Sequence, residues 1–149
     1  MDRWTLGRSE LAEVADGCAC KRLRGAARAV TRRYDEALRP SGLRITQFTL
    51  LVAVAIGEPV PITRLADALG LDRTTLARDL RPLTDRGLVE IRTGDDRRTR
   101  VVRLTGQGRD ALGRAYPLWQ SAQARIVEQS PWPVLAAGLQ EVAAAAHTS

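Results

Sequence analysis

The sequence is poor in the residues on which most catalytic and metal sites depend. Its 149 residues include one histidine, His147, and two cysteines, Cys18 and Cys20. A structural zinc site needs four ligands, and hydrolytic catalysis needs a base beside a nucleophile. One histidine and two cysteines are too few for the first, and no acid pair or second histidine offers a base for the second. Two cysteines also argue against a secreted fold built on disulfides. The sequence therefore predicts no catalytic residues, no metal site and no cofactor, and a protein that is not an enzyme.

Long apolar runs are missing as well. The longest, LLVAVAI at residues 50–56, is far shorter than the roughly 20 residues that span a bilayer. The first residues, MDRWTLGRSELAEVADG, lack the apolar segment of a signal peptide. We expect no membrane partner and a cytoplasmic location. A hydrophobic content of 44% is enough to bury the core of a single chain, residues 1–149.

Lysine is nearly absent, because Lys21 is the only one among 23 basic residues. Arginine therefore carries almost all of the positive charge, against 17 acidic residues and a net charge of +6. A GC-rich genome would favour arginine codons, and the planar guanidinium also suits phosphate and guanine. Composition leaves both explanations open, so the positions of the arginines in the sequence must decide between them.

Most of the chain has helical periodicity. Between Leu11 and Leu38 apolar residues recur every three or four positions without a proline, which predicts one long helix ended by Pro40 and Gly42. Residues 45–57 are almost entirely apolar and predict a buried helix, followed by a turn at GEPVP. Thr105 is a suitable N-cap for a further long helix. Ser130 and Pro131 are suitable as N-cap and first residue of a last helix, with apolar residues on one face from Leu135 to Val142.

A helix-turn-helix pattern occupies the middle of the chain. Residues 62–69 predict a short helix that Gly70 closes in a left-handed conformation, and Asp72 is a natural N-cap for the next helix. In that second helix, Leu76 and Leu80 fall on one face. Thr74 and Arg78 fall on the opposite face, which predicts one side that packs and one that points outward.

Residues 88–104 then change to period two, which predicts a two-stranded ribbon. Between the strands lies TGDDRRTR, in which Gly94 and Asp95 are expected to form the turn. An ordinary hairpin does not need so much arginine. A helix-turn-helix followed at once by such a ribbon is a winged helix.

With this arrangement the chain resembles the MarR family of bacterial transcriptional regulators over most of its length. The strongest match is GLDRTTLARDLRPLTDRGLVEIRTGDDRRTRVVRLTGQG, which is similar to the family's recognition helix, wing and start of the next helix. Asp96, Arg98 and the pair Leu104-Thr105 meet the family's wing pattern. Pro82 departs from it, since a proline there could bend the recognition helix after Arg78.

The resemblance implies double-stranded DNA as partner, with the recognition helix in the major groove and the wing tip in the adjacent minor groove. Asp96 is expected to brace the inserted Arg98. The predicted DNA-binding residues are Arg73, Thr74, Thr75, Arg78, Arg81, Arg97 and Arg98.

The fold class expected is mainly α with a small two- or three-stranded β wing. Residues 45–104 would form a winged helix-turn-helix DNA-binding lobe, and residues 11–39 and 105–147 a helical dimerisation region. The function implied is a homodimeric regulator, a repressor by expectation, on a pseudo-palindromic operator. The resemblance also implies release from DNA by a small aromatic or phenolic ligand.

Two alternatives stay open. In the peroxide-sensing branch of the family a reactive cysteine precedes a tyrosine by fourteen residues, and Cys20 and Tyr34 have this spacing. That span covers about 21 Å of helix, so any contact would need the partner's tyrosine. Cys18 and Cys20 would point to opposite sides of a continuous helix, which argues against a disulfide between them. The second alternative is a winged-helix module that binds protein or RNA.

Overall fold

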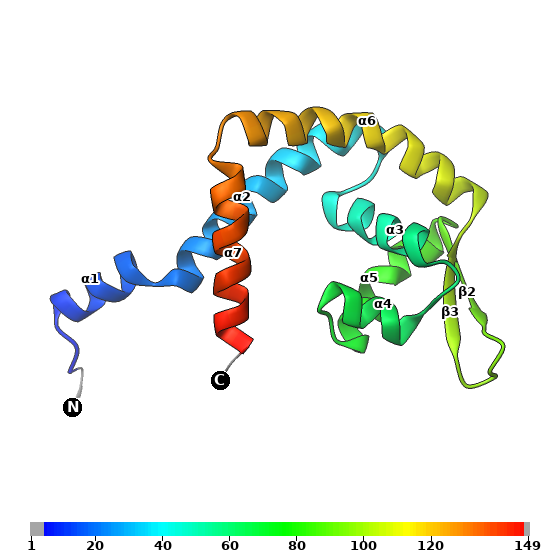
Figure 1. The fold of residues 1–149 in the computed structure, drawn as a ribbon, viewed down its shortest axis with the longest axis horizontal. Helices are drawn as coiled ribbons and strands as arrows, with labels where there is room; N and C mark the ends of the chain where they lie inside the picture. Colours follow the sequence, from blue (N-terminus) through cyan, green and yellow to red (C-terminus); the bar gives the residue numbers. More distant parts are fainter. Residues whose placement is uncertain (1–4, 148–149) are drawn as a thin grey trace. The chain divides into compact units, whose positions relative to one another are not determined.

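The computed structural model describes residues 5–147 and divides into two compact units, Met1–Arg33 and Tyr34–Ser149 (Figure 1). The chain is mainly helical with one small antiparallel sheet, which confirms the predicted fold class. Among the described residues no single helix is long and apolar enough to cross a membrane. One bent pair, Ala19–Ser41 with Ile45–Gly57, passes that test by length and composition only.

The first unit contains helix α1 (Arg8–Gly17) and most of α2 (Ala19–Leu38). The prediction of one continuous helix from Leu11 to Leu38 is therefore wrong, because Cys18 between the two helices is extended, with φ −66° and ψ 110°. Lys21 and Arg22 explain the break, since their side chains donate to the carbonyls of Ala15 and Asp16 at 2.5 and 2.8 Å. These bonds satisfy carbonyls that the end of α1 leaves without helical partners.

The second unit holds the remaining elements. They are the end of α2, a 3₁₀ turn η1 (Arg39–Ser41), α3 (Ile45–Gly57), β1 (Val60–Pro61), α4 (Ile62–Leu69), α5 (Arg73–Asp85), β2 (Val89–Thr93), β3 (Arg100–Leu104), α6 (Gly106–Glu128) and α7 (Trp132–His147). Their order, helix, helix-turn-helix, wing and long helix, is the predicted one. Leu51, Val54, Leu76, Leu83 and Val102 are fully buried at its centre, so α3, α5 and the wing share one core.

The turn between α4 and α5 forms as the glycine predicts. Gly70 adopts φ 63° and ψ 32°, and the amide of Leu71 donates to the carbonyl of Ala66 at 2.9 Å. A residue with a Cβ is strained in this left-handed conformation. Asp72 then caps α5 by accepting a hydrogen bond from the amide of Thr75. Gly70 and Asp72 together fix the start of α5.

The sheet has three strands in the order β1-β3-β2. Val89 pairs with Leu104 and Ile91 with Val102 in the hairpin, and Val60 pairs with Val102 from the other side. Part of the segment expected to be only a turn, GEPVP, is thus the third strand. A two-residue strand next to prolines has too little alternation to be recognised from sequence.

The start of α6 is attached to the start of the wing. The Thr105 hydroxyl accepts from the amide of Gly108 at 3.0 Å and donates to the carbonyl of Gly87 at 2.6 Å. The Thr105 amide also donates to the carbonyl of Leu88 at 3.1 Å. Thr105 is therefore the predicted N-cap and, in addition, the residue that joins α6 to the strand entering the wing.

Candidate nucleic-acid interface

The outward face of α5 carries the exposed side chains Arg73, Thr74 and Arg78, as its periodicity predicts. Thr75 lies differently, because it is only partly exposed and its hydroxyl donates to Asp72 Oδ2 at 2.7 Å. The Thr75 side chain thus belongs to the cap. Thr75 was predicted to contact DNA, but its observed hydrogen bonds serve to cap and position α5.

The cap also fixes the charge of Asp72. Hydrogen bonds from the side chain and then the amide of Thr75 lower the pKa of Asp72 below its ordinary value. A carboxylate at a helix N-terminus is favourable because it meets unpaired amides and the positive end of the helix dipole. The stability that this cap contributes is present above the ordinary pKa of the group and is lost as the pH falls through the lowered one.

Further along α5, two arginines lie beside acids. Arg78 is 3.6 Å from Asp79, and Arg81 is 3.9 Å from Asp85, one turn away. All four side chains are exposed to a large extent, so these pairs are weak and open easily for another anion. Pro82 lies inside α5, which nevertheless continues to Asp85. Arg81 thus remains on the helix despite the proline.

The wing turn lies three residues later than expected. The Thr99 amide donates to the Asp96 carbonyl at 2.8 Å, which makes Asp96 and Thr99 the ends of a four-residue turn. Arg97 and Arg98 occupy its two corner positions, and the assignment of the turn to Gly94 and Asp95 is wrong. Asp96 Oδ1 accepts from the backbone amide of Arg98 at 3.0 Å. Asp96 therefore orders the backbone from which Arg98 projects.

A hollow between α5 and the wing brings together residues predicted for different grooves. Its volume is about 230 Å³, and its lining includes Arg73 at the start of α5, Arg98 at the turn and Arg100 on β3. Thr63 of α4 and Thr99 of the wing also line it. Three guanidinium groups therefore gather around one concave site.

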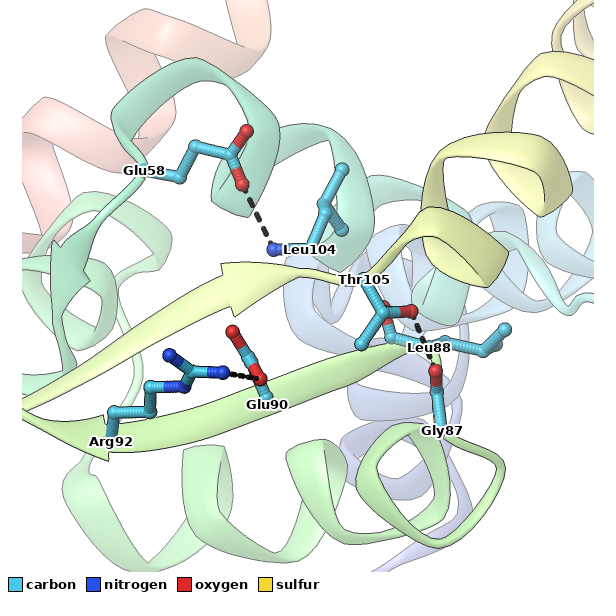
Figure 2. Close-up of polar contacts among 7 residues, drawn as sticks. All are labelled: Glu58, Gly87, Leu88, Glu90, Arg92, Leu104 and Thr105. Atoms are coloured by element: carbon cyan, nitrogen blue, oxygen red, sulfur yellow. Dashed lines mark hydrogen bonds and ion pairs between the residues drawn. The ribbon is translucent and has the colours of Figure 1, made fainter.

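The base of the wing is anchored by Glu58, which follows α3 (Figure 2). Its carboxylate accepts from the amide of Leu104 at 2.9 Å and lies 2.5 Å from the guanidinium of Arg109. Desolvation raises the pKa of Glu58, but the Leu104 hydrogen bond and Arg109 together outweigh it and hold the pKa below 4.5. Figure 2 also shows Arg92 paired with Glu90 two residues earlier on β2, and the two groups lie 2.8 Å apart.

Two substitutions of Glu58 distinguish the contribution of its hydrogen bond to Leu104 from that of its ion pair with Arg109. Glu58→Ala is expected to lower the free energy of unfolding by about 1–3 kcal/mol, because it leaves the Leu104 amide without an acceptor. Glu58→Gln keeps an acceptor and loses only the half-exposed ion pair, so its cost should stay below about 1 kcal/mol. Urea unfolding measures both. The deficit of Glu58→Gln should shrink in acid, as the wild-type carboxylate protonates; a deficit that is constant with pH would contradict the role of its charge.

A second concave site, an apolar groove of about 410 Å³, lies between α3 and α6. It is lined by Phe48, Val52 and Ala55 from α3, by Leu112, Gly113 and Tyr116 from α6, and by Leu104 and Arg109. Trp119 stacks on Phe48 and on Tyr116, with ring centres 5.9 and 6.0 Å apart. The groove therefore has an aromatic wall and one cationic residue, Arg109, which also holds Glu58.

The candidate redox residues both lie on α2. Cys20 is exposed, and both cysteines are free. Tyr34 is buried, which raises its pKa, and its hydroxyl donates to the Gln123 side chain of the same chain. The extended conformation at Cys18 removes the reason for placing the two thiols on opposite sides, since that reason required a continuous helix. The spacing of Cys20 and Tyr34 stays a prediction.

The sequence did not predict the roles of four polar residues in this region. Glu58 and Arg109 anchor the wing, and Thr63 and Thr99 line the hollow. Glu58 lies in a segment that reads only as a turn, and Arg109 reads as one of many exposed arginines on a helix. No local pattern announces a contact between residues 51 positions apart. Only the pairing of β1 with β3 brings Glu58 to the end of the wing.

The face formed by α5 and the wing differs from a typical protein-binding surface in its lack of exposed large hydrophobic side chains among residues 5–147. Within residues 5–147, the large hydrophobic side chains that are exposed lie on α1, α2, α3, α6 and α7 or just before α1, and none lies on α4, α5 or the wing. A wing used for protein contact would more usually present an apolar patch. The face formed by α5 and the wing is instead polar and rich in arginine.

Comparison with known proteins gives consistent matches. The model of the MarR family matches residues 41–99. The structure of the Mycobacterium tuberculosis transcriptional regulator MosR in complex with DNA is 39% identical, covers 87% of this chain and 96% of its own, and superposes with a TM-score of 0.81. An uncharacterised HTH-type transcriptional regulator of Bacillus subtilis, YwoH, is 29% identical over 79 residues, which are 53% of this chain and 58% of YwoH.

CouR is a further similar protein with structures in two states. CouR from Rhodococcus jostii RHA1 bound to p-coumaroyl-CoA is 26% identical, covers 85% of this chain and 90% of its own, and has a TM-score of 0.69. The transcriptional repressor CouR bound to a 23-mer DNA duplex is 27% identical, covers 95% and 98%, and has a TM-score of 0.75.

Proposed function

Because this chain belongs to the MarR family of DNA-binding transcriptional regulators, we propose that it represses transcription as a homodimer bound to a pseudo-palindromic operator. It is a transcriptional regulator and not an enzyme, which confirms the prediction made from its composition. The observation that carries the proposal is the capped helix α5 beside an arginine-tipped wing, on a face without exposed large apolar side chains. A helix and a hairpin side by side fit the two grooves of duplex DNA.

Within this proposal α5 enters the major groove. Thr74 and Arg78 project from its first two turns, where recognition helices make most of their base contacts. Arg78 and Arg81 can exchange their weak surface pairs with Asp79 and Asp85 for guanine or phosphate. Arg97 and Arg98, at the corners of the wing turn, reach the minor groove, where the negative potential is concentrated in A·T-rich sequence.

Dimerisation is supported by apolar side chains that each unit leaves exposed. In the first unit Leu11 and Val14 on α1 are 42% and 65% exposed, and α1 buries no residue. In the second unit α7 also buries none, and Val134 and Val142 are 75% and 48% exposed. Helices that bury nothing within their own chain gain stability by covering one another across a two-fold axis.

Protection of DNA around the protein's own gene tests the operator and the dimer together. We expect two protected half-sites about 10 base pairs apart, related by a two-fold axis. The mass of the complex should correspond to two chains per operator. A single protected half-site, or one chain per site, would contradict the homodimer. Absence of any protected DNA at low salt would contradict the repressor itself.

The apolar groove between α3 and α6 supports release by a small aromatic ligand. Its volume is within the range of small-molecule sites, and Phe48, Tyr116 and Arg109 suit a ring with an acidic group. An anion that attracts Arg109 would weaken its pair with Glu58, which anchors the end of β3. The protection assay, repeated with a panel of aromatic carboxylates, should show loss of protection with one of them. If none has an effect at millimolar concentration, ligand release by this route is wrong.

A further inference from the structure

The arginines of the second unit differ in whether a carboxylate lies beside them. Arg78, Arg81, Arg92 and Arg109 each lie within 4 Å of a carboxylate. The arginines around the hollow between α5 and the wing, Arg73, Arg98 and Arg100, have no such partner within residues 5–147. Three arginines without a carboxylate partner around one concave site create a positive potential that attracts an anion.

The neighbouring acids cannot neutralise this cluster without leaving other bonds. The Asp72 carboxylate accepts from both the amide and the hydroxyl of Thr75. Asp96 accepts from the backbone amide of Arg98. Both carboxylates thus order the elements that carry the arginines. Thr63 and Thr99 line the same hollow, and in the described part of the chain their hydroxyls donate no hydrogen bond.

The position of the hollow identifies the anion. If α5 lies in the major groove and the wing in the adjacent minor groove, the sugar-phosphate strand that separates these grooves must pass between them. The hollow is the space between α5 and the wing, and α4, which contributes Thr63, is the helix that crosses the backbone in this type of motif. Its volume of about 230 Å³ exceeds that of one phosphate group.

We propose that this hollow, lined by Arg73, Arg100, Thr63 and Thr99, is a site for one DNA backbone phosphate, which sets the register of α5 and the wing on the duplex. The proposal rests on the function proposed above. It assigns Arg73 to phosphate and not to a base edge, and it adds Arg100 to the binding residues. Because phosphate contacts carry no sequence information, the site contributes equally to operator and to unrelated DNA.

The test compares Arg73→Gln, Arg100→Gln and the double variant with Arg125→Gln, which removes one exposed charge near the far end of α6. Affinity for the operator and for a random duplex is measured by fluorescence anisotropy over a range of salt concentrations. Each single variant should weaken both DNAs by the same factor, about tenfold. The slope of log K against log salt should become shallower by about 0.9, the value for one phosphate.

The double variant is the decisive measurement. If both arginines hold the same phosphate, its slope should change by about 0.9 in total, not by twice that amount. A doubled change would mean two separate phosphates, and a larger loss on operator than on random DNA would mean a base contact; each result overturns the shared site. If Arg73→Gln and Arg100→Gln match Arg125→Gln while the wild type shows a steep slope, the site fails and the proposed function stands. If the wild type binds no duplex, the proposed function fails.

Titration with inorganic phosphate at constant ionic strength distinguishes a free anion from a backbone phosphate. Amide resonances of Thr63 and Thr99 should shift weakly in the wild type and not in Arg73→Gln. Saturation at micromolar phosphate, with loss of DNA binding, would overturn the assignment to DNA, because the hollow would then be a site for a free anion.

Discussion

Replacing Gly108 with alanine is expected to lower the free energy of unfolding by about 3 kcal/mol, or more, because the new methyl group has no space. A Cβ at this position would lie 2.0 Å from the carbonyl oxygen of Leu88 and 3.0 Å from its carbon. Both are backbone atoms at the start of the wing, and Thr105 holds them against α6. Relief therefore requires moving the helix or the strand.

Gly113→Ala is the matched control. It lies on the same helix, five residues further, and a Cβ there meets nothing within 4 Å. Helix propensity alone predicts that both substitutions stabilise, by up to about 1 kcal/mol. Opposite signs for the two variants, measured by urea unfolding at equal protein concentration, would confirm the contact with Leu88. Equal stability of the two would show that α6 can withdraw from the wing at little cost.

Arg98→Ala is expected to weaken operator binding by about 10- to 100-fold at fixed salt, the effect of losing a charged hydrogen-bonding group from the interface. The loss should be greatest where A·T-rich sequence faces the wing, since a narrow minor groove attracts the guanidinium most strongly. Asp96→Ala should weaken binding in the same direction and less, because it removes only the acceptor that orders the Arg98 amide. Titration of labelled operator measures all of these affinities.

Arg92→Ala serves as control for the wing. Arg92 lies on β2 and its charge is already paired with Glu90, so its removal should change affinity by less than about threefold. An operator affinity of Arg98→Ala equal to that of wild type would remove the wing from the binding mechanism.

Periodicity and capping residues predicted the helix-turn-helix and the helix after the wing well. The helix-turn-helix, the left-handed Gly70, and the N-caps Asp72 and Thr105 all form as expected. These features depend on interactions between residues that are close in sequence, so the local sequence is enough to predict them. The same is true of the outward face of α5, which follows from the spacing of Leu76 and Leu80.

The errors have a different origin. The break at Cys18 leaves the apolar spacing around it unchanged, and it depends on where the side chains of Lys21 and Arg22 turn. The wing turn was misplaced because glycine is the usual turn residue, whereas here the carbonyl and the carboxylate of Asp96 accept the hydrogen bonds from Thr99 and Arg98 that form the turn. No residue of this turn needs a positive φ, so glycine has no advantage there.

Contacts between distant segments could not be predicted at all. Glu58 reaches the amide of Leu104 only after β1 pairs with β3, and Arg73 and Arg100 line the same hollow only after α5 packs on the wing. From the local sequence alone, each of these polar side chains would be expected simply to face solvent. The role of Glu58 and the placing of Arg100 beside the same hollow as Arg73 therefore follow from the tertiary arrangement alone.

The junction between β3 and α6 determines where this fold can accept changes in length. Leu104 is fixed to Glu58 and the next residue, Thr105, to Gly87, so two consecutive residues are tied to opposite edges of the wing. The loop from Gly94 to Thr99 has no comparable ties outside itself and can be longer or shorter in related proteins. One residue inserted after Leu104 would instead rotate α6 by about 100°. The buried stripe of Gly108, Ala111 and Ala115 would then leave the core.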